Sequence, residues 1–510
     1  MKTFKNPILS GFYPDPSICR AGDDYYMVTS TFTYFPGVPV FHSKDLVHWK
    51  QIGNALHRPE HAKLTGEVSR GIFAPTIRYN EGVFYMITTN VSHGGNFLVT
   101  ATNPGGPWSN PYFLEGANGI DPSLFFDDDG KCYYHGTGDR REGAKYYGDN
   151  EIYLQELDLN TMKLVGERYA IWHSALKDAV WPEGPHIYKK DGYYYLMISE
   201  GGTGPDHAIT IARSKNLTDY YQGYRSNPIL THRHLGSKYP IVNVGHGDLV
   251  ETQNGEWWMV LLASRPYGGH FRNLGRETFL VPVEWENGWP VVNYGIGLVL
   301  DEDRFPNLTP VPVSDENSFD FTKINEFPVN MLFLRNPVME DYKFDNGLNL
   351  RLSKNPITQL DNPVSFYAIR QQHMNFEVST TLDFTPANEN QAAGLVIYQS
   401  SAFHYQFLLW GSKLKVIKCH TKELTTIAEC EAPKGKLNLK ISAQGQNLTF
   451  TCGTDCIYSN ADARMLSTDV AGGFVGNTIG MYAVNNGEEA GDVFARFENL
   501  AYSLENDGGF

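Results

Sequence analysis

The stretch KDGYYYLMISEGG, residues 190–202, carries the pattern that decides the fold. Its Asp-Gly pair is typical of a tight hairpin turn, and the aromatic and aliphatic run that follows favours a β-strand. Four related stretches precede or follow it in the first half of the chain, namely AGDDYYMVTST (21–31), YNEGVFYMITTN (79–90), DDDGKCYYHGTG (127–138) and QNGEWWMVLLAS (253–264). The sequence therefore predicts five repeated β-hairpins.

The spacing of these hairpins indicates the architecture. Their turns are about 48 to 63 residues apart, at Asp24, Gly82, Gly130, Gly192 and Gly255. That is the length of a four-stranded β-propeller blade with its loops. No segment of comparable length in this half has sustained helical periodicity, which argues against a barrel of alternating strands and helices. We therefore predict a five-bladed β-propeller over residues 1–315.

The second half of the chain has a different pattern. The repeat stops, and residues 316–510 contain alternating stretches such as NFEVSTTLDF and YQFLLWG. Such stretches predict a β-sandwich, jelly-roll-like in its connections. Two domains also agree with the length of 510 residues, since single cores stop growing at roughly 250–300 residues. The expected fold class is all-β.

Composition and charge limit the partners. A formal net charge of -15, with no basic run to offset it, disfavours nucleic acid. The start MKTFKNPILSGFYPDPS lacks the apolar run of a secretory signal, and no stretch approaches the ~20 apolar residues of a membrane span. We expect a cytoplasmic protein without a membrane partner. The six scattered cysteines are predicted to be free thiols, and the sandwich makes a homo-oligomer a further expectation.

One position of the repeat stands out. In a propeller, the strand before each hairpin turn lines the central channel at an equivalent height. Nine residues before each turn lie Asp15, Phe73, Asp121, Glu183 and His246. A position that only packed a core would favour apolar residues. Each carboxylate alone is better explained as a turn residue beside Pro or Gly, but three in one register favour a site on the propeller axis.

The chemistry of three gathered carboxylates is specific. They repel one another, so the least solvated one should have a raised pKa and hold a proton near neutral pH. One acid and one base result, which is the division of roles that hydrolysis of a glycosidic bond needs, and a third carboxylate can tune the acid. The alternative from another class is a sugar-binding propeller, in which Asp15, Asp121 and Glu183 only accept hydrogen bonds.

Residues near this position extend the prediction. Most aromatic residues of such a chain belong to the core, but some near this position would contact the faces of a sugar. These are Tyr13, Phe32, Phe35, Phe73 and Trp181. Arg276 would bind sugar hydroxyls or pair with Glu183, and a surface ion pair is an equal alternative. His246 would either bind a metal at the axis or donate a hydrogen bond to a carboxylate or water.

At these residues the chain resembles glycoside hydrolase family 43, the β-xylosidase and α-L-arabinofuranosidase group. The matching motifs run through most of the first 300 residues in the family's order, and include NPILSGFYPDPSI, GIDPSLF, EGPHIY, GHGDLVETQNGEWW and LGRET. The resemblance implies an inverting enzyme in which Asp15 is the general base, Asp121 tunes the acid and Glu183 is the acid. It also implies that Arg276 contacts substrate. His246 lies where some relatives hold calcium, and no other cofactor is expected.

Two features bear on the substrate. Many family β-xylosidases read Trp-Ala-Pro-Asp where this chain has Phe73, Ala74, Pro75 and Thr76, which leaves the choice of pentose open. Longer family members carry a C-terminal sandwich whose aromatic loop closes the active-site mouth. Here GGFVGNTIGMYA offers Phe474, which would equally suit the sandwich core. The expected activity is exo-acting release of terminal xylose from β-1,4-xylooligosaccharides, with α-L-arabinofuranosidase or dual activity on arabinoxylan fragments as the alternative.

Overall fold

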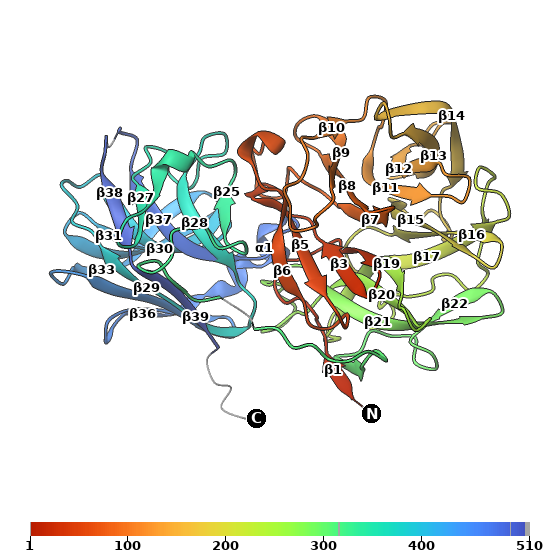
Figure 1. Ribbon diagram of the computed structural model, residues 1–510. Coiled ribbons are helices and arrows are strands. Elements are labelled where there is room, and N and C mark those ends of the chain that lie inside the picture. Colours follow the sequence, from red (N-terminus) through yellow and green to blue (C-terminus); the bar gives the residue numbers. More distant parts are fainter. Residues whose placement is uncertain (1, 315–316, 490, 505–510) are drawn as a thin grey trace.

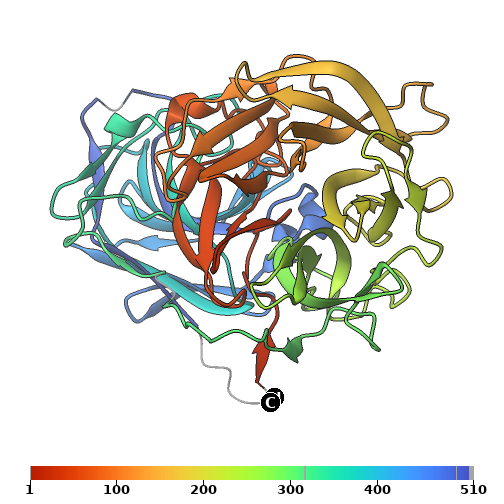
Figure 2. The same ribbon diagram turned by 45° about the vertical axis from the view of Figure 1, so that its right-hand side comes forward.

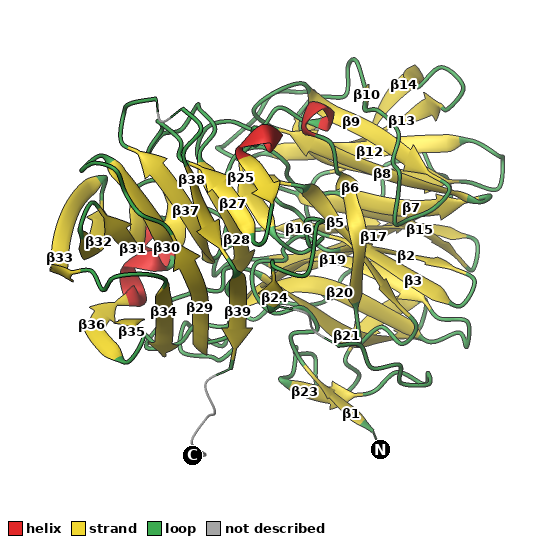
Figure 3. Ribbon diagram, turned by 60° about the vertical axis from the view of Figure 1, so that its left-hand side comes forward, coloured by secondary structure: helices red, strands yellow, loops and turns green. Residues whose placement is uncertain are grey.

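The computed structural model describes residues 2–314, 317–489 and 491–504, and strands form nearly all of their regular structure (Figures 1 and 3). Five four-stranded sheets come first along the chain, and two larger sheets follow. The all-β class, the five blades and the sandwich are thereby confirmed. The expected boundary between residues 315 and 316 lies outside the described residues.

Each blade consists of strands in chain order, with only β4 left out of blade one, and the first strands of neighbouring blades contact one another around the axis. The blades are β2 (Ser17–Ala21), β3 (Asp24–Val28), β5 (Gly37–Ser43) and β6 (Lys50–Leu56); β7 (Thr76–Asn80), β8 (Val83–Asn90), β9 (Gly95–Ala101) and β10 (Tyr112–Phe113); β11 (Ile120–Phe126), β12 (Cys132–Asp139), β13 (Asn150–Asp158) and β14 (Lys163–Trp172); β15 (Glu183–Lys190), β16 (Tyr193–Glu200), β17 (Ala208–Ser214) and β18 (Gln222–Gly223); and β19 (Val242–Glu251), β20 (Trp257–Ser264), β21 (Glu277–Glu286) and β22 (Trp289–Val292).

The hairpin between the first two strands of a blade forms as its sequence predicts. Lys190 of β15 pairs with Tyr193 of β16, which leaves a two-residue turn. Both turn residues have positive φ, 48° at Asp191 and 72° at Gly192. That conformation is the type I′ turn, which matches the twist of the flanking strands and favours Asp-Gly.

The two ends of the propeller ring meet along a seam that the N-terminal segment forms. The short strands β1 (Thr3–Lys5) and β23 (Glu302–Arg304) pair with each other, and Leu9 forms a bridge with Thr278 of blade five. The buried Asn6 side chain donates to the carbonyls of Leu280 and Leu300, each at 3.0 Å, and accepts from the Leu280 amide at 2.9 Å. These bonds fasten the start of blade one to blade five.

The second domain is a sandwich of two sheets beside the propeller (Figure 1). The nine-stranded sheet contains β24 (Phe319–Asp320), β26 (Tyr342–Phe344), β27 (Leu348–Arg351), β29 (Asn375–Asp383), β34 (Leu437–Gln444), β35 (Asn447–Cys452), β36 (Asp455–Asp462), β38 (Phe494–Phe497) and β39 (Asn499–Ser503). The eight-stranded sheet contains β4 (Tyr34–Phe35), β25 (Leu332–Leu334), β28 (Ser365–Arg370), β30 (Gln391–Ser400), β31 (Phe403–Trp410), β32 (Lys413–His420), β33 (Glu423–Glu431) and β37 (Thr478–Asn485). Burial alternates strictly along β29, as its sequence predicts for a strand with one face in a core.

A strand from the propeller half belongs to the sandwich. β4 lies in a loop of blade one, yet it pairs with β25, so that Phe35 is opposite Phe333 and Tyr34 is opposite Leu334. The arginine after β25, Arg335, donates its amide to the carbonyl of Thr33 at 2.8 Å. The two domains therefore share a sheet edge.

Helix is scarce in the described residues. Besides the four-residue helix α1 (Thr468–Ala471), they contain only the 3-10 turns Pro59–His61, Met339–Asp341 and Ala463–Leu466. α1 lies between the two domains, and in Figure 2 the blue segment that contains it reaches toward the blades. No helix of the described chain has the length and apolar character that crossing a membrane requires.

Candidate active site

The axial position that the repeat singled out has an unusual backbone. Asp15, Asp121 and His246 occupy it in blades one, three and five, with φ of 55°, 53° and 49°. Strand pairing is also irregular just after Ile120 in β11, after Glu183 in β15 and on both sides of Gly245 in β19. Positive φ is costly for non-glycine residues and bulges re-aim side chains, and both are concentrated at functional sites. Here they direct polar side chains toward the axis.

These side chains meet in one cavity. All five residues of the predicted position line it, together with three residues expected from other segments, Phe32, Arg276 and Phe474. The complete lining is Asp15, Phe32, Phe73, Ala74, Ile120, Asp121, Glu183, Thr203, His207, His246, Leu262, Arg276 and Phe474. The structure thus brings the three predicted catalytic carboxylates, His246, Arg276 and three of the predicted aromatic residues to a single site.

Asp15 is held as a carboxylate. Its side chain is buried and accepts hydrogen bonds from the Ser30 hydroxyl at 2.6 Å and from Arg276 Nη1 at 2.9 Å. His246 Nδ1 lies 3.8 Å from Oδ1. Burial acts to raise the pKa of Asp15, but the charges of Arg276 and His246 and the Ser30 bond outweigh it and lower the pKa. Asp15 is therefore ionised at neutral pH.

Asp121 and Glu183 titrate in the opposite direction. Burial raises the pKa of Asp121 to about 6. The charge of His246 and a hydrogen bond from the Gly184 amide at 3.0 Å act against this shift, while the charge of Asp15 adds to it. Burial, with the charges of Asp121 and Asp15, raises the pKa of Glu183 well above its usual range. One cavity thus contains an ionised carboxylate and a protonated carboxylic acid.

Three aromatic rings form an apolar wall opposite these groups. Phe32 stacks with Phe474 at a centroid distance of 6.0 Å, and Phe73 meets both rings edge-on at 5.8 and 5.9 Å. The Arg276 guanidinium lies 5.7 Å from the centre of Phe32 and 5.4 Å from that of Phe474. Since Phe474 belongs to the sandwich domain, the second domain completes this wall.

The Phe474 loop is fixed by contacts with propeller loops. The amide of Phe474 donates to Ser69 Oγ at 2.8 Å, and the amide of Asn477 donates to the Asn273 carbonyl at 3.0 Å. Arg272 forms an ion pair with Asp469 just before the loop and donates to its carboxylate through both Nε and Nη2. The loop therefore has a defined position over the cavity.

Two aromatic residues considered from the sequence lie elsewhere. Phe35 packs on Phe333 in the sandwich, and Tyr13 packs edge-on against Phe41 in a hydrophobic cluster. Their neighbours come from segments distant in sequence, which the local pattern does not reveal. Trp181 lines an adjoining cavity instead.

Two polar residues of the cavity, Thr203 and His207, were missed. Thr203 Oγ1 accepts from Arg276 Nη1 at 3.2 Å. His207 Nδ1 donates to the carbonyl of Asn243 at 3.0 Å, and burial lowers its pKa to about 3, so the ring is neutral. Both follow the second strand of blade four, as Phe32 follows that of blade one, so this shared place in the repeat was the available signal.

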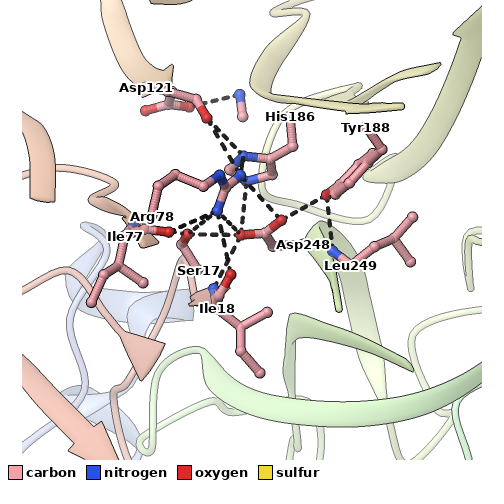
Figure 4. A network of polar contacts seen from close by, with 11 residues as sticks. Ser17, Ile18, Ile77, Arg78, Asp121, His186, Tyr188, Asp248 and Leu249 are labelled. Carbon is pink, nitrogen blue, oxygen red and sulfur yellow. Dashed lines mark hydrogen bonds and ion pairs between the residues drawn. The ribbon is translucent and has the colours of Figure 1, made fainter. Parts of the chain in front are cut away.

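A polar network lies next to the carboxylates and joins the innermost strands of all five blades (Figure 4). Its centre is Asp248 on β19, which accepts from Arg78 at 2.8 Å, from Ser17 at 2.7 Å and from Tyr188 at 2.6 Å. Arg78 Nη2 also donates to His186 Nδ1 at 2.8 Å. Burial acts to raise the pKa of Asp248, but the charge of Arg78 and the hydrogen bonds from Arg78 and Tyr188 outweigh it and lower the pKa. The network fastens the blades together where the site is built.

The residues around His246 do not by themselves make a calcium site. Ca²⁺ takes six to eight oxygen ligands, whereas His246 offers one nitrogen and the nearby Asp15 is already paired with Arg276. Among the described residues no group of three His, Cys, Asp or Glu side chains is placed to hold a metal. A calcium ion at the axis would depend on water ligands; it stays a prediction, and no catalytic step below uses it.

An acid and a carboxylate base in one small cavity, walled by aromatic rings, define the site of a glycoside hydrolase. Residues 4–290 match the family model of glycosyl hydrolases family 43, and residues 318–503 match the model of the β-xylosidase C-terminal concanavalin A-like domain. The chain therefore belongs to glycoside hydrolase family 43.

Relatives match nearly the whole length of the chain. A xylosidase/arabinosidase of Butyrivibrio fibrisolvens is 49% identical over 508 residues, which is 95% of this chain and 96% of that protein. A non-reducing end α-L-arabinofuranosidase of Bacteroides ovatus is 41% identical, and the match spans 96% of this chain and 92% of that protein. The solved xylan β-1,4-xylosidase of Bacillus halodurans superposes with a TM-score of 0.90 at 34% identity, over 98% of this chain and 100% of that one.

Proposed function

We propose that this glycoside hydrolase releases terminal xylose from the non-reducing end of β-1,4-xylooligosaccharides with inversion. Asp15 takes a proton from water as the water oxygen bonds to the anomeric carbon. Glu183 gives its proton to the leaving oxygen as the glycosidic bond breaks. Asp121 keeps Glu183 protonated by its nearby charge, and Arg276 holds Asp15 in position.

The observation that carries this proposal is the opposite direction of the pKa shifts of Asp15 and Glu183. A general base must be ionised and a general acid protonated at the same pH. Environments that push two carboxyl groups apart in pKa identify these roles in glycosidases.

The exo mode of action follows from the wall of the cavity. Phe474, which the second domain supplies, lines it beside Phe32 and Phe73. If these rings bound the cavity on this side, it accepts the end of a chain and not a continuing one. This supports release of single terminal residues.

α-L-Arabinofuranosidase activity is the second candidate, because relatives with that activity and with xylosidase activity both match along the whole chain. Nitrophenyl β-xyloside and nitrophenyl α-L-arabinofuranoside assayed side by side separate the two. We expect xyloside turnover at least equal to arabinofuranoside turnover. Undetectable xyloside hydrolysis beside rapid arabinofuranoside hydrolysis would reverse the assignment.

The sugar-binding alternative is tested by Glu183→Gln. We expect the variant to lose about 10²- to 10⁴-fold in kcat on xylobiose, whose leaving sugar needs protonation, and Asp15→Asn to lose a comparable factor. Proton NMR of the parent reaction should show α-xylose as the first product. If both variants kept full activity, neither carboxyl group would have the proposed role.

Cytoplasmic location, a homo-oligomer and the lack of nucleic-acid and membrane partners stay predictions. Fractionation of the source cells tests the location, and sedimentation velocity tests the oligomeric state.

A further inference from the structure

A second cavity adjoins the first at the proposed acid. It is lined by Asn118, Gly119, Ile120, Thr137, Gly138, Asp139, Asn150, Trp181 and Glu183, so that Ile120 and Glu183 are common to both cavities. The acid must reach the oxygen between the terminal sugar and the rest of the chain. If Glu183 has that role, the second cavity receives the leaving part of the substrate. This assignment of the second cavity rests on the proposed function, in which Glu183 is the acid.

Trp181 is held at the edge of this cavity by a costly backbone. Its φ is 51°, a conformation that a bulky residue rarely adopts. Its amide donates to the Gly148 carbonyl at 2.7 Å. A side chain added at Gly202 would come within 2.6 Å of the indole ring, so Gly202 leaves the space that the ring occupies. Even so, 39% of Trp181 remains exposed.

Tyr147 extends the aromatic surface outward. Its ring meets Trp181 edge-on at a centroid distance of 5.6 Å, yet 82% of the residue is exposed. The loop that carries it is ordered by its neighbours: Asp149 accepts from Arg140 Nη1 at 2.9 Å, and Tyr146 donates to the Ala179 carbonyl at 2.9 Å. A fixed loop that presents an uncovered ring next to a polar cavity is typical of a binding surface.

We propose that Trp181 and Tyr147 form a platform for the leaving end of the oligosaccharide, with Trp181 against the first leaving sugar and Tyr147 against the second. The neutral amides of Asn118 and Asn150, which also line this cavity, suit sugar hydroxyls. The order follows from position, because Trp181 lines the cavity that Glu183 shares, whereas Tyr147 does not line it and contacts Trp181 from outside. The platform makes the enzyme prefer chains of three or more sugars.

The test measures binding in the Glu183→Gln background, where turnover does not consume the ligand. Dissociation constants for xylobiose and xylotriose are measured by calorimetry with and without Tyr147→Ala. We expect Tyr147→Ala to weaken xylotriose roughly 3- to 10-fold more than xylobiose, and Tyr147→Phe to restore most of the difference. Trp181→Ala should weaken both ligands.

Tyr294→Ala is the matched control, since Tyr294 is 58% exposed and lines neither cavity. It should leave both constants unchanged. If Glu183→Gln binds xylooligosaccharides but Tyr147→Ala affects both lengths equally or not at all, the platform is wrong while the proposed function stands. If the Glu183→Gln protein binds neither ligand, the proposed substrate and the platform fall together.

Discussion

Asp15 and Glu183 differ in protonation because each has different neighbours in one cavity. Asp15 has Arg276 and Ser30 within hydrogen-bond distance, while Glu183 faces the like charges of Asp121 and Asp15. The pKa of Asp121 is set by opposing causes, since burial raises it while the Gly184 amide and His246 lower it. The charge of this residue therefore sets how firmly Glu183 keeps its proton.

The pH profile of Asp121→Asn tests that dependence. Removing the charge removes one cause of the raised pKa of Glu183, so the acid loses its proton at lower pH. We expect the alkaline limb of kcat/KM to move to lower pH, measured on xylobiose, where the limb reports the free enzyme. Asp191→Asn, at an exposed turn of the blade that carries Glu183, should leave the limb in place. An unmoved limb in Asp121→Asn would show that Asp121 does not act on the acid.

Among the elements of the fold, the loop that carries Phe474 depends on close backbone contact with the propeller. A side chain at Gly476 would lie 2.4 Å from the carbonyl oxygen of Leu274, and one at Gly275 would lie 2.6 Å from the Gly476 nitrogen. Neither contact leaves room for a methyl group. The distance between the Arg276 loop and the Phe474 loop is therefore set by two glycines.

Gly476→Ala should separate these loops. Because the methyl group meets backbone, which yields little, we expect a loss of about 1–3 kcal/mol in stability and a lower kcat/KM through displacement of Phe474. Thermal unfolding and xylobiose kinetics measure the two effects. Gly204→Ala is the matched control, since a methyl group there meets nothing within 4 Å. Equal behaviour of the two variants would contradict the close-contact explanation.

Local elements were predictable from the sequence, and contacts across the chain were not. The Asp-Gly turn before Tyr193 specifies its hairpin through backbone preferences alone, and the equal offset of Asp15, Asp121 and Glu183 from such turns placed them in one cavity. Phe35 gives no local sign that β4 joins the sandwich, because its partner Phe333 is distant in the chain. His207 was missed for a similar reason, since the cavity around it is formed by several blades.

For the molecule as a whole, the ring must be closed for the site to exist. Asp15 belongs to blade one and Arg276 to blade five, so their ion pair crosses the seam between the first and last blades. The side chain of Asn6 holds the same seam with three hydrogen bonds. The position of Asp15 therefore depends on the same contacts that close the propeller ring.

Asn6→Ala should loosen that seam. It leaves two buried carbonyls and one amide without partners, and we expect a loss of roughly 1–3 kcal/mol in stability, seen as a lower urea midpoint. Asn254→Ala, which removes an exposed bond to the Asn307 carbonyl, should change stability by less than about 0.5 kcal/mol. A midpoint as high as that of the parent would mean that other contacts close the ring.

The shared edge between β4 and β25 has a consequence for recombination between relatives. Phe32 lies just before β4, whose partner is a sandwich strand, and Phe474 comes from the sandwich itself. Two of the three rings in the cavity wall thus owe their position to the C-terminal domain. A chimaera that joins this propeller to the sandwich of an arabinofuranosidase should inherit part of the donor's preference among pentoses, although every proposed catalytic carboxylate would be unchanged.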